Sequence, residues 1–399
     1  MKVLALLSRV PWPLDKGDKL RAFHLLRHLA GPHQVYLICL SGKPIADAAS
    51  RELDQLFAEV HILRRSRLQS WLQLALGVFS RKPFQVLYFH QKRLQRQVDE
   101  LIERIQPDHV YCQLVRCAEY VRHLQGIHKT LDYMDALSKG MQRRQKHGSL
   151  LLRPFVYSEA RRLRRYERAV FSAFDHHTII TQYERQFIDH PLRDNITVIA
   201  NGVDGALLAP QARPPRFDIL FHGNLSYEPN VQCALYIARH ILPRLRRARP
   251  SIRILISGAT PCKRVRALTR HREITISGWV ADLRETYAAA RLFLAPMLIG
   301  SGLQNKLLEA MAARLPCVIS PLANQALGAR SGREVLVAST PEEFTRAILH
   351  LFDHPDVARQ QATAALEFVR ARFNWQDSAT RLENLLQIQR TTPHQVLPI

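Results

Sequence analysis

The sequence lacks a long apolar run and any pairing of cysteines typical of a zinc or redox motif. The apolar stretch nearest the N-terminus, Val3–Leu7, stops at Ser8, so we expect no secretory signal peptide. No segment approaches the roughly 18 apolar residues of a membrane-spanning helix. The six cysteines include no Cys-x-x-Cys pair and no Cys/His cluster with zinc spacing. We therefore predict a cytoplasmic protein without a structural zinc site or disulfide.

Acidic residues are scarce beside basic ones. The chain has 34 Asp and Glu against 57 Lys and Arg, a net charge of +23 that is shared evenly by its two halves. This excess favours an anionic partner: a phosphorylated substrate, an anionic membrane surface or a nucleic acid. An arginine-rich composition without a functional role is the alternative. We expect no nucleic acid as partner, because the few aromatic residues lie mostly in predicted strands and helices.

Short apolar runs alternate with amphipathic segments along the whole chain. Runs such as Val35–Leu40 and Ile252–Ser257 have the length and β-branched content of buried parallel strands. Segments such as Leu20–Leu29, Pro154–Phe174 and Val231–Arg247 have helical periodicity. This alternation predicts an α/β protein whose parallel sheets carry helices on both faces.

One break in the alternation predicts a domain boundary. The turn Asn201–Asp204 is followed by Pro210, Pro214 and Pro215, and a new strand begins near Phe217. We predict two doubly wound, Rossmann-like domains, residues 1–204 and 205–374. Ligands of such sheets bind at the carboxyl ends of the strands, so we expect the domains to face each other across a cleft that holds the site.

A glycine loop in the second half has the features of a phosphate site. Gly300–Gly302 follows a predicted strand, and a helix begins near Asn305 or Lys306. Backbone N–H groups and the positive helix end would meet a phosphate there, Lys306 would add a charge, and Glu309 could accept hydrogen bonds from a ribose. The alternative is an ordinary turn with a helix-stabilising acid. The chain has no GxxxxGK[ST] motif, which excludes a P-loop NTPase, and no GxGxxG after its first strand, which argues against a dinucleotide enzyme.

Four segments of this half resemble glycosyltransferases of family 4, which have the GT-B fold. Glu309–Ala312 with the following Pro316–Ile319 resembles their donor-nucleotide helix, and Asn201–Asp204 their domain-closing turn. His222–Asn230 resembles the glycine turn after the first strand of their second domain, and Ser277–Asp282 the loop that packs on the base.

Two segments of the N-terminal half point to one subgroup. Pro11–Arg21 and Leu131–Ser138 are similar to the sugar transferases associated with exosortase/PEP-CTERM exopolysaccharide systems.

The resemblance implies a retaining, hexosyltransferase-type enzyme of exopolysaccharide or cell-surface polysaccharide biosynthesis. It would move a sugar from a nucleotide-sugar donor, bound by the C-terminal domain, to a glycan or lipid-linked acceptor, bound by the N-terminal domain. The helix at about 375–399 would pack back on the N-terminal domain. We expect no cofactor and no metal. The residues implied to bind the donor are Gly223, Asn224, Ser301, Gly302, Leu303, Lys306 and Glu309.

The sequence departs from the family pattern in two places. The first of two usual glutamates falls on Ser301, which leaves backbone N–H groups to contact the sugar. The segment where many members place a histidine reads Thr130–Asp135, so Asp132 or Asp135 is the candidate for catalysis; a helix N-cap is the alternative for either. Gly17 and Asp18, after the first strand, are candidates for a loop beside the acceptor and the donor phosphates, with plain turn chemistry as the alternative.

A basic and apolar segment predicts contact with an anionic membrane surface at the inner face of the cytoplasmic membrane. Arg64, Arg65 and Arg67 precede the apolar stretch Leu68–Phe79, and Arg81 and Lys82 follow it. The alternative is an apolar core segment with solvated arginines. Two other functions stay open at this point: a GT-B nucleotide-sugar epimerase, and a basic nucleic-acid-binding protein.

Overall fold

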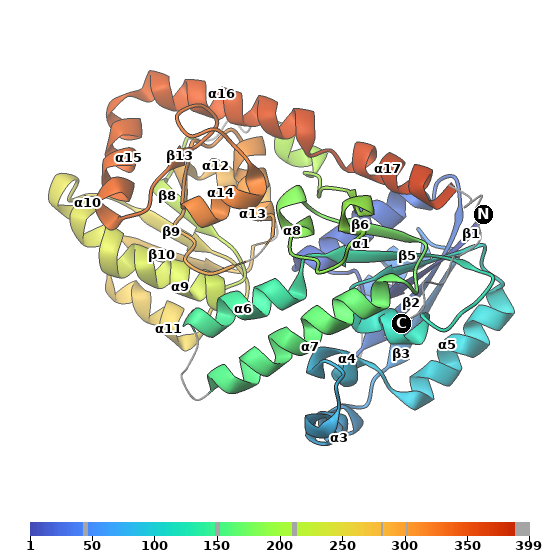
Figure 1. Cartoon of the computed structure of the whole chain (residues 1–399). Coiled ribbons are helices and arrows are strands. Elements are labelled where there is room, and N and C mark those ends of the chain that lie inside the picture. Colours follow the sequence, from blue (N-terminus) through green and yellow to red (C-terminus); the bar gives the residue numbers. More distant parts are fainter. Residues whose placement is uncertain (43–46, 148–151, 210–213, 281, 301, 388–399) are drawn as a thin grey trace. The chain divides into compact units, whose positions relative to one another are not determined.

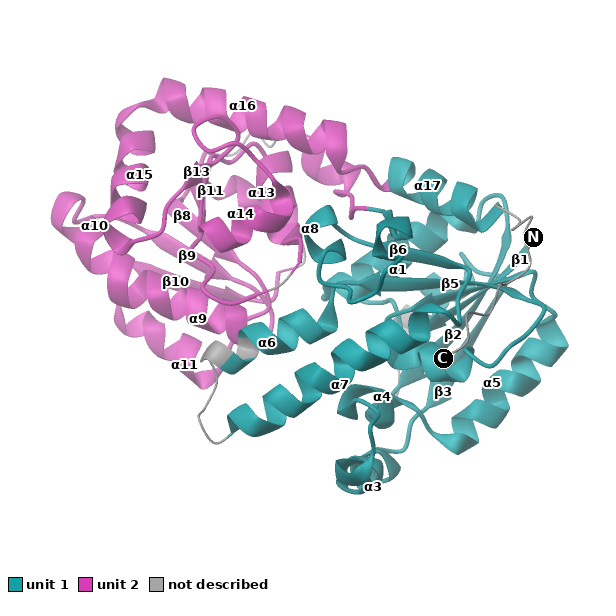
Figure 2. Ribbon diagram, in the orientation of Figure 1, with its two compact units in different colours: residues 1–199, 376–399 teal, residues 200–375 magenta. Residues whose placement is uncertain are grey.

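The computed structural model describes residues 1–42, 47–147, 152–209, 214–280, 282–300 and 302–387. The chain forms two compact units (Figure 2). Unit 1 contains residues 1–199 and the C-terminal segment from Gln376, and unit 2 contains residues 200–375.

Unit 1 is built on a seven-stranded parallel sheet with the order β3-β2-β1-β4-β5-β6-β7 (Figure 1). Val3 at the centre lies opposite Val35 on one side and His109 on the other. The strands are β1 Lys2–Leu7, β2 Gln34–Ser41, β3 Glu59–Arg64, β4 His109–Gln113, β5 His128–Met134, β6 His176–Ile179 and β7 Thr197–Val198.

Helices cover this sheet and connect its strands, because two neighbouring parallel strands must be joined by a crossover connection, which is usually a helix. The helices of unit 1 are α1 Gly17–Leu29, α2 Asp47–Asp54, α3 Arg67–Leu76, α4 Phe84–Phe89, α5 Lys92–Ile105, α6 Leu137–His147, α7 Arg153–Phe171, α8 Gln182–Arg185 and α17 Trp375–Gln387. Short 3₁₀ turns add η1 Gly77–Phe79, η2 Val115–Tyr120 and η4 Arg193–Asn195.

Unit 2 is built on a six-stranded parallel sheet with the order β10-β9-β8-β11-β12-β13. Its strands are β8 Phe217–His222, β9 Ile254–Ser257, β10 Ile274–Gly278, β11 Ala290–Ala295, β12 Cys317–Ile319 and β13 Leu336–Val337. Its helices are α9 Glu228–Tyr236, α10 Leu242–Ala248, α11 Lys263–Arg266, α12 Leu283–Ala288, α13 Asn305–Ala312, α14 Pro321–Leu327, α15 Pro341–Asp353 and α16 Pro355–Arg372, with η5 Gly205–Leu208, η6 Ile237–Ile241 and η7 Ala267–Arg270.

The apolar runs form the centres of both sheets, because a strand covered by helices on both faces has no side open to water. Val3–Leu7 in unit 1 is fully buried, and so is Leu292–Ala295 in unit 2. The prediction of an α/β protein with two doubly wound parallel sheets is confirmed.

The predicted helix over Val231–Arg247 is confirmed, with one irregularity. Helix α9, one wider π turn over Ile237–Ile241 and helix α10 follow one another without a gap. Pro243, in the first turn of α10, has no backbone N–H to continue the ladder of the preceding turn, which is the physical reason for the irregularity.

The turn Asn201–Asp204 belongs to unit 2. The N–H of Val203 donates to the carbonyl of Phe373 (3.0 Å), and Val203 forms a parallel bridge with Asn374. A Cβ on Gly202 would lie 2.3 Å from the backbone nitrogen of Trp375, so glycine is needed for this close packing. The two units therefore divide just before this turn.

Helix α17 returns the chain to unit 1. Leu382 and Leu386 are buried, and Glu383 forms an ion pair with His33 at 3.2 Å. The segment after Gln387 lies outside the described residues.

Candidate functional site

Two glycines lie at the carboxyl ends of the neighbouring strands β8 and β9 in unit 2. Gly223 has a φ of +152°, and a Cβ on it would lie 2.7 Å from Nδ2 of Asn230. A Cβ on Gly258 would lie only 1.8 Å from the carbonyl oxygen of Gly223. The backbones of the two turns touch, and neither position has room for a side chain. Gly223 was predicted from the sequence, whereas Gly258 lies in no recognised motif.

Asn224 shapes this turn with its side chain. Its Oδ1 accepts hydrogen bonds from the N–H of Ser226 (3.0 Å), from Oγ of Ser226 (2.7 Å) and from Oγ1 of Thr260 (3.1 Å). Its carbonyl accepts from Nδ2 of Asn230 at 2.9 Å. Asn224 thus holds the turn after β8 against the turn after β9, so its contribution is to position the site.

Lys306 is a buried cation in the first turn of α13. Only 8% of the residue is exposed, its Nζ donates to Oδ1 of Asn230, and it lies 5.0 Å from the centre of the Phe221 ring. Burial lowers the pKa of Lys306 to about 8, partly opposed by Cys233 and Glu309. The positive charge that we expect at Lys306 is therefore carried by a desolvated ammonium group, which a bound anion would stabilise.

Glu309 lies one turn further along the same helix. Its Oε2 accepts a hydrogen bond from the hydroxyl of Tyr287 at 2.7 Å, and burial raises the pKa of the carboxyl. Tyr287, on α12, is fully buried. The second carboxylate oxygen can accept from a ligand hydroxyl. Sequence reasoning missed Tyr287, because nothing in its local pattern connects it with α13.

His222, the last residue of β8, adds a neutral imidazole beside Lys306. Burial and then the charge of Lys306 lower the pKa of His222 to about 4, so the ring is uncharged at pH 7. Its Nδ1 is buried and has no hydrogen-bond partner among the residues that the structure describes. The ring lies 5.8 Å from that of Tyr287. His222 lies in the motif His222–Asn230, but nothing in the sequence alone indicates a role for it.

The glycine loop before α13 is described in part. Leu303 is buried, Gly302 has a φ of +69°, and Ser301 lies outside the described residues. At the start of α13, Oδ1 of Asn305 accepts from Nδ2 of Asn201 at 2.9 Å. The turn before η5 is thus connected to the helix that carries Lys306 and Glu309.

Asp132 in unit 1 is the centre of a buried polar network. It is fully buried within β5 and forms an ion pair with Arg21, whose Nε lies 2.7 Å from Oδ2. Tyr111 donates to Oδ2 (2.6 Å) and Thr178 to Oδ1 (2.9 Å). Strand β5 continues past Asp132 to Met134, so Asp132 lies inside the sheet. Its carboxylate is occupied by protein donors, so its geometry is that of a structural residue.

Asp135 lies in the turn between β5 and α6. Burial, and next the charge of Glu184, raise the pKa of Asp135 to about 7. Its Oδ1 is buried without a hydrogen-bond partner in the described part of the chain. The backbone before it is turned by Met134, at a φ of +60°. Of the two candidates for catalysis, Asp135 is the one with a carboxyl oxygen still to be satisfied.

Gly17 and Asp18 begin α1, after β1. Gly17 is exposed, and Oδ2 of Asp18 forms an ion pair with Arg9 at 2.5 Å. The carbonyl of Asp18 accepts from Nε2 of Gln113, at the end of β4, at 3.0 Å. These contacts join two neighbouring strand ends of unit 1.

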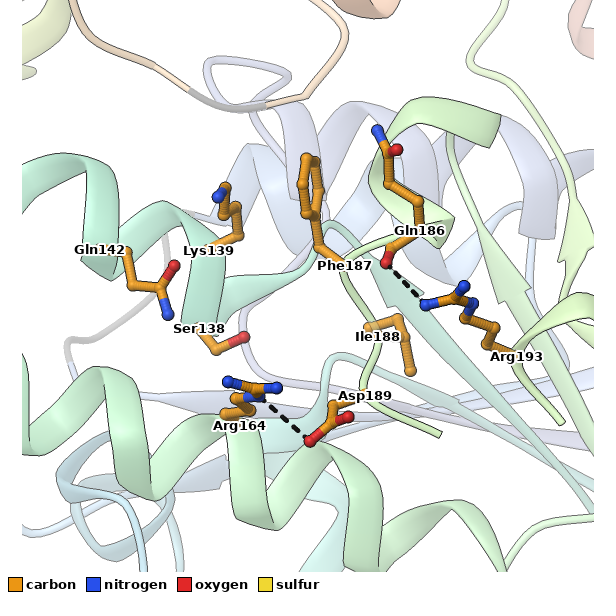
Figure 3. Close-up of a pocket in the computed structure, with 9 residues that line it drawn as sticks. All are labelled: Ser138, Lys139, Gln142, Arg164, Gln186, Phe187, Ile188, Asp189 and Arg193. Atoms are coloured by element: carbon orange, nitrogen blue, oxygen red, sulfur yellow. Dashed lines mark hydrogen bonds and ion pairs between the residues drawn. The ribbon is translucent and has the colours of Figure 1, made fainter. Parts of the chain in front are cut away.

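Unit 1 also contains a basic pocket of about 230 Å³ (Figure 3). Lys139, Arg164 and Arg193 lie around it, from α6, α7 and η4. One acid, Asp189, pairs with Arg164 at 3.0 Å. Sequence reasoning did not predict this pocket, whose lining residues are Ser138, Lys139, Gln142, Arg164, Gln186, Phe187, Ile188, Asp189 and Arg193.

The described ranges hold no group of three or more His, Cys, Asp or Glu side chains placed to bind a metal. Within the same ranges, no helix combines the length and the apolar character that crossing a membrane requires.

The architecture is that of a two-domain α/β protein with the GT-B fold. The structure of HepE from Anabaena in complex with UDP and glucose superposes with a TM-score of 0.69 at 13% identity and covers 96% of this chain and 99% of that one. Residues 216–354, most of unit 2, match the family described as Glycosyl transferases group 1.

Two curated proteins are similar in sequence. A glycogen synthase from Mycobacterium tuberculosis is 30% identical over 197 residues, which are 46% of this chain and 46% of the synthase, so the similarity spans less than half of either protein. An uncharacterized 44.6 kDa protein in the cps region of Klebsiella pneumoniae is 20% identical over 404 residues, covering 94% of this chain and 96% of that protein.

Proposed function

We propose that this protein transfers a sugar from a nucleotide-sugar donor to an acceptor. The observation that carries the proposal is a cluster of three polar side chains in unit 2. The cluster consists of the buried Lys306, the neutral His222 and Glu309, which has one carboxylate oxygen bonded to Tyr287. It lies beside the two touching turns that contain Gly223 and Gly258. The cluster lies inside residues 216–354, which match the glycosyltransferase family. Among proteins with this fold, HepE was solved with UDP and glucose.

Each residue of the cluster has a proposed role. Lys306 binds the diphosphate and stabilises the negative charge that grows on it as the sugar leaves. Glu309 accepts hydrogen bonds from the ribose hydroxyls through the oxygen that Tyr287 does not occupy. Nδ1 of His222 makes a hydrogen bond to the donor. The backbone N–H groups of residues 301–303 contact the phosphates or the transferred sugar, and Gly223 allows close approach to the β8 turn.

Unit 1 binds the acceptor. Its basic pocket supports a glycan or lipid-linked acceptor that carries a phosphate or a carboxylate, because three cations face one acid there. As the acceptor oxygen bonds to the sugar and the diphosphate leaves, we assign to the Asp135 carboxylate the uptake of the proton that the acceptor hydroxyl loses, because the pKa of Asp135 lies near neutrality. Gly17 and Asp18 form the loop that lines the acceptor side. Retention of configuration, independence of metals and a role in exopolysaccharide or cell-surface polysaccharide synthesis complete the proposal, the last supported by the similar protein from a cps region.

A thermal-shift screen over nucleotide sugars tests the donor assignment. A ligand at 100 times its Kd should stabilise unit 2 by about 2.7 kcal/mol. The matching donor is then incubated with candidate acceptors, and release of free nucleotide is measured. Release that depends on acceptor supports transfer. Conversion of the donor into another nucleotide sugar without acceptor would contradict it and point to an epimerase.

A further inference from the structure

Large exposed apolar side chains gather on two neighbouring segments of unit 1. Phe79 is 93% exposed, Leu76 72% and Trp71 65%. We define the apolar patch as these residues together with the other exposed apolar side chains of α3, η1 and the start of α7, which are Leu68, Leu72, Val78, Leu152, Phe155 and Tyr157. A patch of this kind marks an interaction surface.

The two segments are fastened together by polar contacts. Arg162 of α7 donates to the carbonyls of Gly77 (2.7 Å) and Val78 (3.0 Å), so η1 is tied to α7. The ring of Phe155 stacks on that of Phe84 at 4.7 Å. The N–H of Phe84 donates to the buried carboxylate of Glu159, also on α7, at 2.7 Å. These contacts hold the two segments of the patch in fixed positions relative to each other. Figure 1 shows α3 projecting beyond β3 and α4.

The chain around the patch carries positive charge without negative charge. Residues 60–98 contain eight Lys and Arg and no Asp or Glu, and residues 136–158 contain five and none. Arg67 and Arg81 are exposed on either side of the α3–η1 segment, and Arg153 is exposed at the start of α7. Lys82 is paired with Glu119 at 2.5 Å, but an anionic surface would gain from the exposed Arg67, Arg81 and Arg153.

We propose that the apolar patch inserts into the interface of an anionic lipid bilayer, with the flanking arginines on the lipid headgroups. Aromatic and aliphatic side chains beside cations are the composition of interfacial helices. An anionic surface compensates Arg67, Arg81 and Arg153 together, which a protein partner of mixed charge would do only in part. Within the patch, we expect the side chains of Trp71, Leu76 and Phe79 to insert most deeply into the lipid interface.

Arg65 has a different role from the one that the sequence predicts. Its Nη1 donates to the carbonyl of Tyr88 (3.0 Å) and to Oγ of Ser70 (3.1 Å), and its guanidinium lies 3.8 Å from the centre of the Tyr88 ring. Arg65 therefore connects α3 to α4 and is half-buried. Reversing its charge would disrupt the fold, so a test of membrane contact must leave Arg65 unchanged.

The apolar arm of the test uses the full chain and vesicles of phosphatidylcholine with or without phosphatidylglycerol. We expect wild-type protein to co-sediment with the anionic vesicles and not with the neutral ones. Trp71→Ser with Phe79→Ser should lower the partition coefficient by at least roughly tenfold. Leu192→Ser, another exposed apolar residue of unit 1, is the matched control and should bind as wild type does.

The charge arm compares two triple variants with the same net charge. Arg67→Glu, Arg81→Glu and Arg153→Glu should abolish binding at low salt. These changes should spare the fold, because an acid at Arg67 or Arg153, the first residues of α3 and α7, suits the helix dipole, and Arg81 is exposed between η1 and α4. The control reverses the exposed Arg239, Arg247 and Arg270 of unit 2 and should retain most of the binding.

Three results would overturn the proposal: wild-type protein that ignores anionic vesicles, a Trp71/Phe79 variant that binds like wild type, or two triple variants that lose binding equally. Sedimentation velocity tests a second copy of the chain as the occupant; a dimer that Phe79→Ser dissociates would contradict a lipid surface. Vesicle binding is measured without donor or acceptor, so its outcome is independent of the proposed transfer.

Discussion

Lys306 is the residue whose chemistry depends most on its surroundings. The pKa of a buried lysine falls because the ammonium loses its hydration, and here it falls to about 8. Its charged form therefore destabilises the unliganded fold below pH 8, and this cost is relieved as the pH rises from 8 toward the ordinary value of 10.5. A diphosphate bound as proposed would reverse this preference for the neutral form, because an adjacent anion stabilises the ammonium.

Lys306→Met should weaken binding of nucleoside diphosphates by roughly tenfold to a hundredfold, the worth of a charge-assisted hydrogen bond. Binding of the bare nucleoside should change little. In wild-type protein, the diphosphate affinity should fall as the pH rises through 8, and this slope should vanish in the variant. Isothermal titration calorimetry between pH 7 and 9.5 measures all three. An equal loss for nucleoside and diphosphate would indicate a folding defect.

Glu309→Gln should lower donor affinity by roughly tenfold to a hundredfold, because it removes the charged acceptor for the ribose hydroxyls. Size and helix propensity are kept, so the fold should persist. Tyr287→Phe is the matched control: it removes the hydrogen bond to Oε2 and leaves the carboxylate, so its effect should be smaller. Unchanged donor KM and kcat in a folded Glu309→Gln protein would disprove the assignment.

At the scale of elements, the β8 and β9 turns depend on each other. The carbonyl of Gly223 occupies the place where a side chain on Gly258 would begin, and Asn224 joins the two turns through Thr260. A change in one turn therefore displaces the other, together with Asn230 and the ammonium that it binds.

Gly258→Ala should destabilise unit 2 by at least about 2 kcal/mol, because a Cβ 1.8 Å from a carbonyl oxygen forces the turns apart. Donor affinity should fall with it. Gly205→Ala is the control: a Cβ there meets nothing within 4 Å, and its effect should stay within about 0.5 kcal/mol. Urea unfolding followed by donor titration measures both. Equal stability of the two variants would rule out a close contact between the turns after β8 and β9 at Gly258.

The ion pair between Arg21 and Asp132 connects four elements of unit 1. Arg21 comes from α1 and Asp132 from β5, and Tyr111 of β4 and Thr178 of β6 donate to the same carboxylate. Arg21 also donates to the carbonyl of Ile199, after β7, at 2.8 Å. Breaking such a pair leaves an uncompensated charge in the protein interior.

Arg21→Met should therefore cost unit 1 about 3–5 kcal/mol. Asp132→Asn keeps some of the hydrogen bonds and should cost less, while Arg21→Met with Asp132→Leu, which removes both charges, should recover much of the loss. Thermal unfolding of the three variants measures this order. If Asp132→Asn were fully stable yet inactive, Asp132 would have a catalytic role that its burial does not indicate.

At the scale of the whole molecule, the two units are not consecutive in the chain. Unit 1 is completed by α17, which follows all of unit 2. The apolar face of α17, with Ala379, Leu382 and Leu386, is buried. The C-terminal helix is therefore part of the core that holds the N-terminal sheet.

A truncation that removes residues 376–399 should destabilise unit 1 by several kcal/mol, because each buried leucine contributes about 1.5–3 kcal/mol. Since whole domains are stable by only about 5–15 kcal/mol, unit 1 should unfold or become open to protease. A truncation after Gln387 keeps α17 and is the control. Hydrogen exchange followed by mass spectrometry distinguishes the units; loss of protection in unit 2 rather than unit 1 would contradict this division.

The sequence alone determined the α/β class, the two parallel sheets and the start of α13. These features follow from local patterns: an apolar run such as Val3–Leu7 must be covered on both faces, and a glycine loop before an amphipathic segment begins a helix. The motifs that resemble the glycosyltransferase family are also contiguous in the chain. For these features, the residues that matter are close neighbours in sequence.

Only the tertiary structure decided what each polar side chain does. Lys306 is buried because Asn230 and Phe221 lie against it, and Glu309 meets a tyrosine from α12. Asp132 is paired with an arginine 111 residues away. Arg65 points inward while Phe79, in the same apolar and basic segment, is exposed. Burial and pairing depend on which distant segments pack together, and no local pattern specifies those contacts.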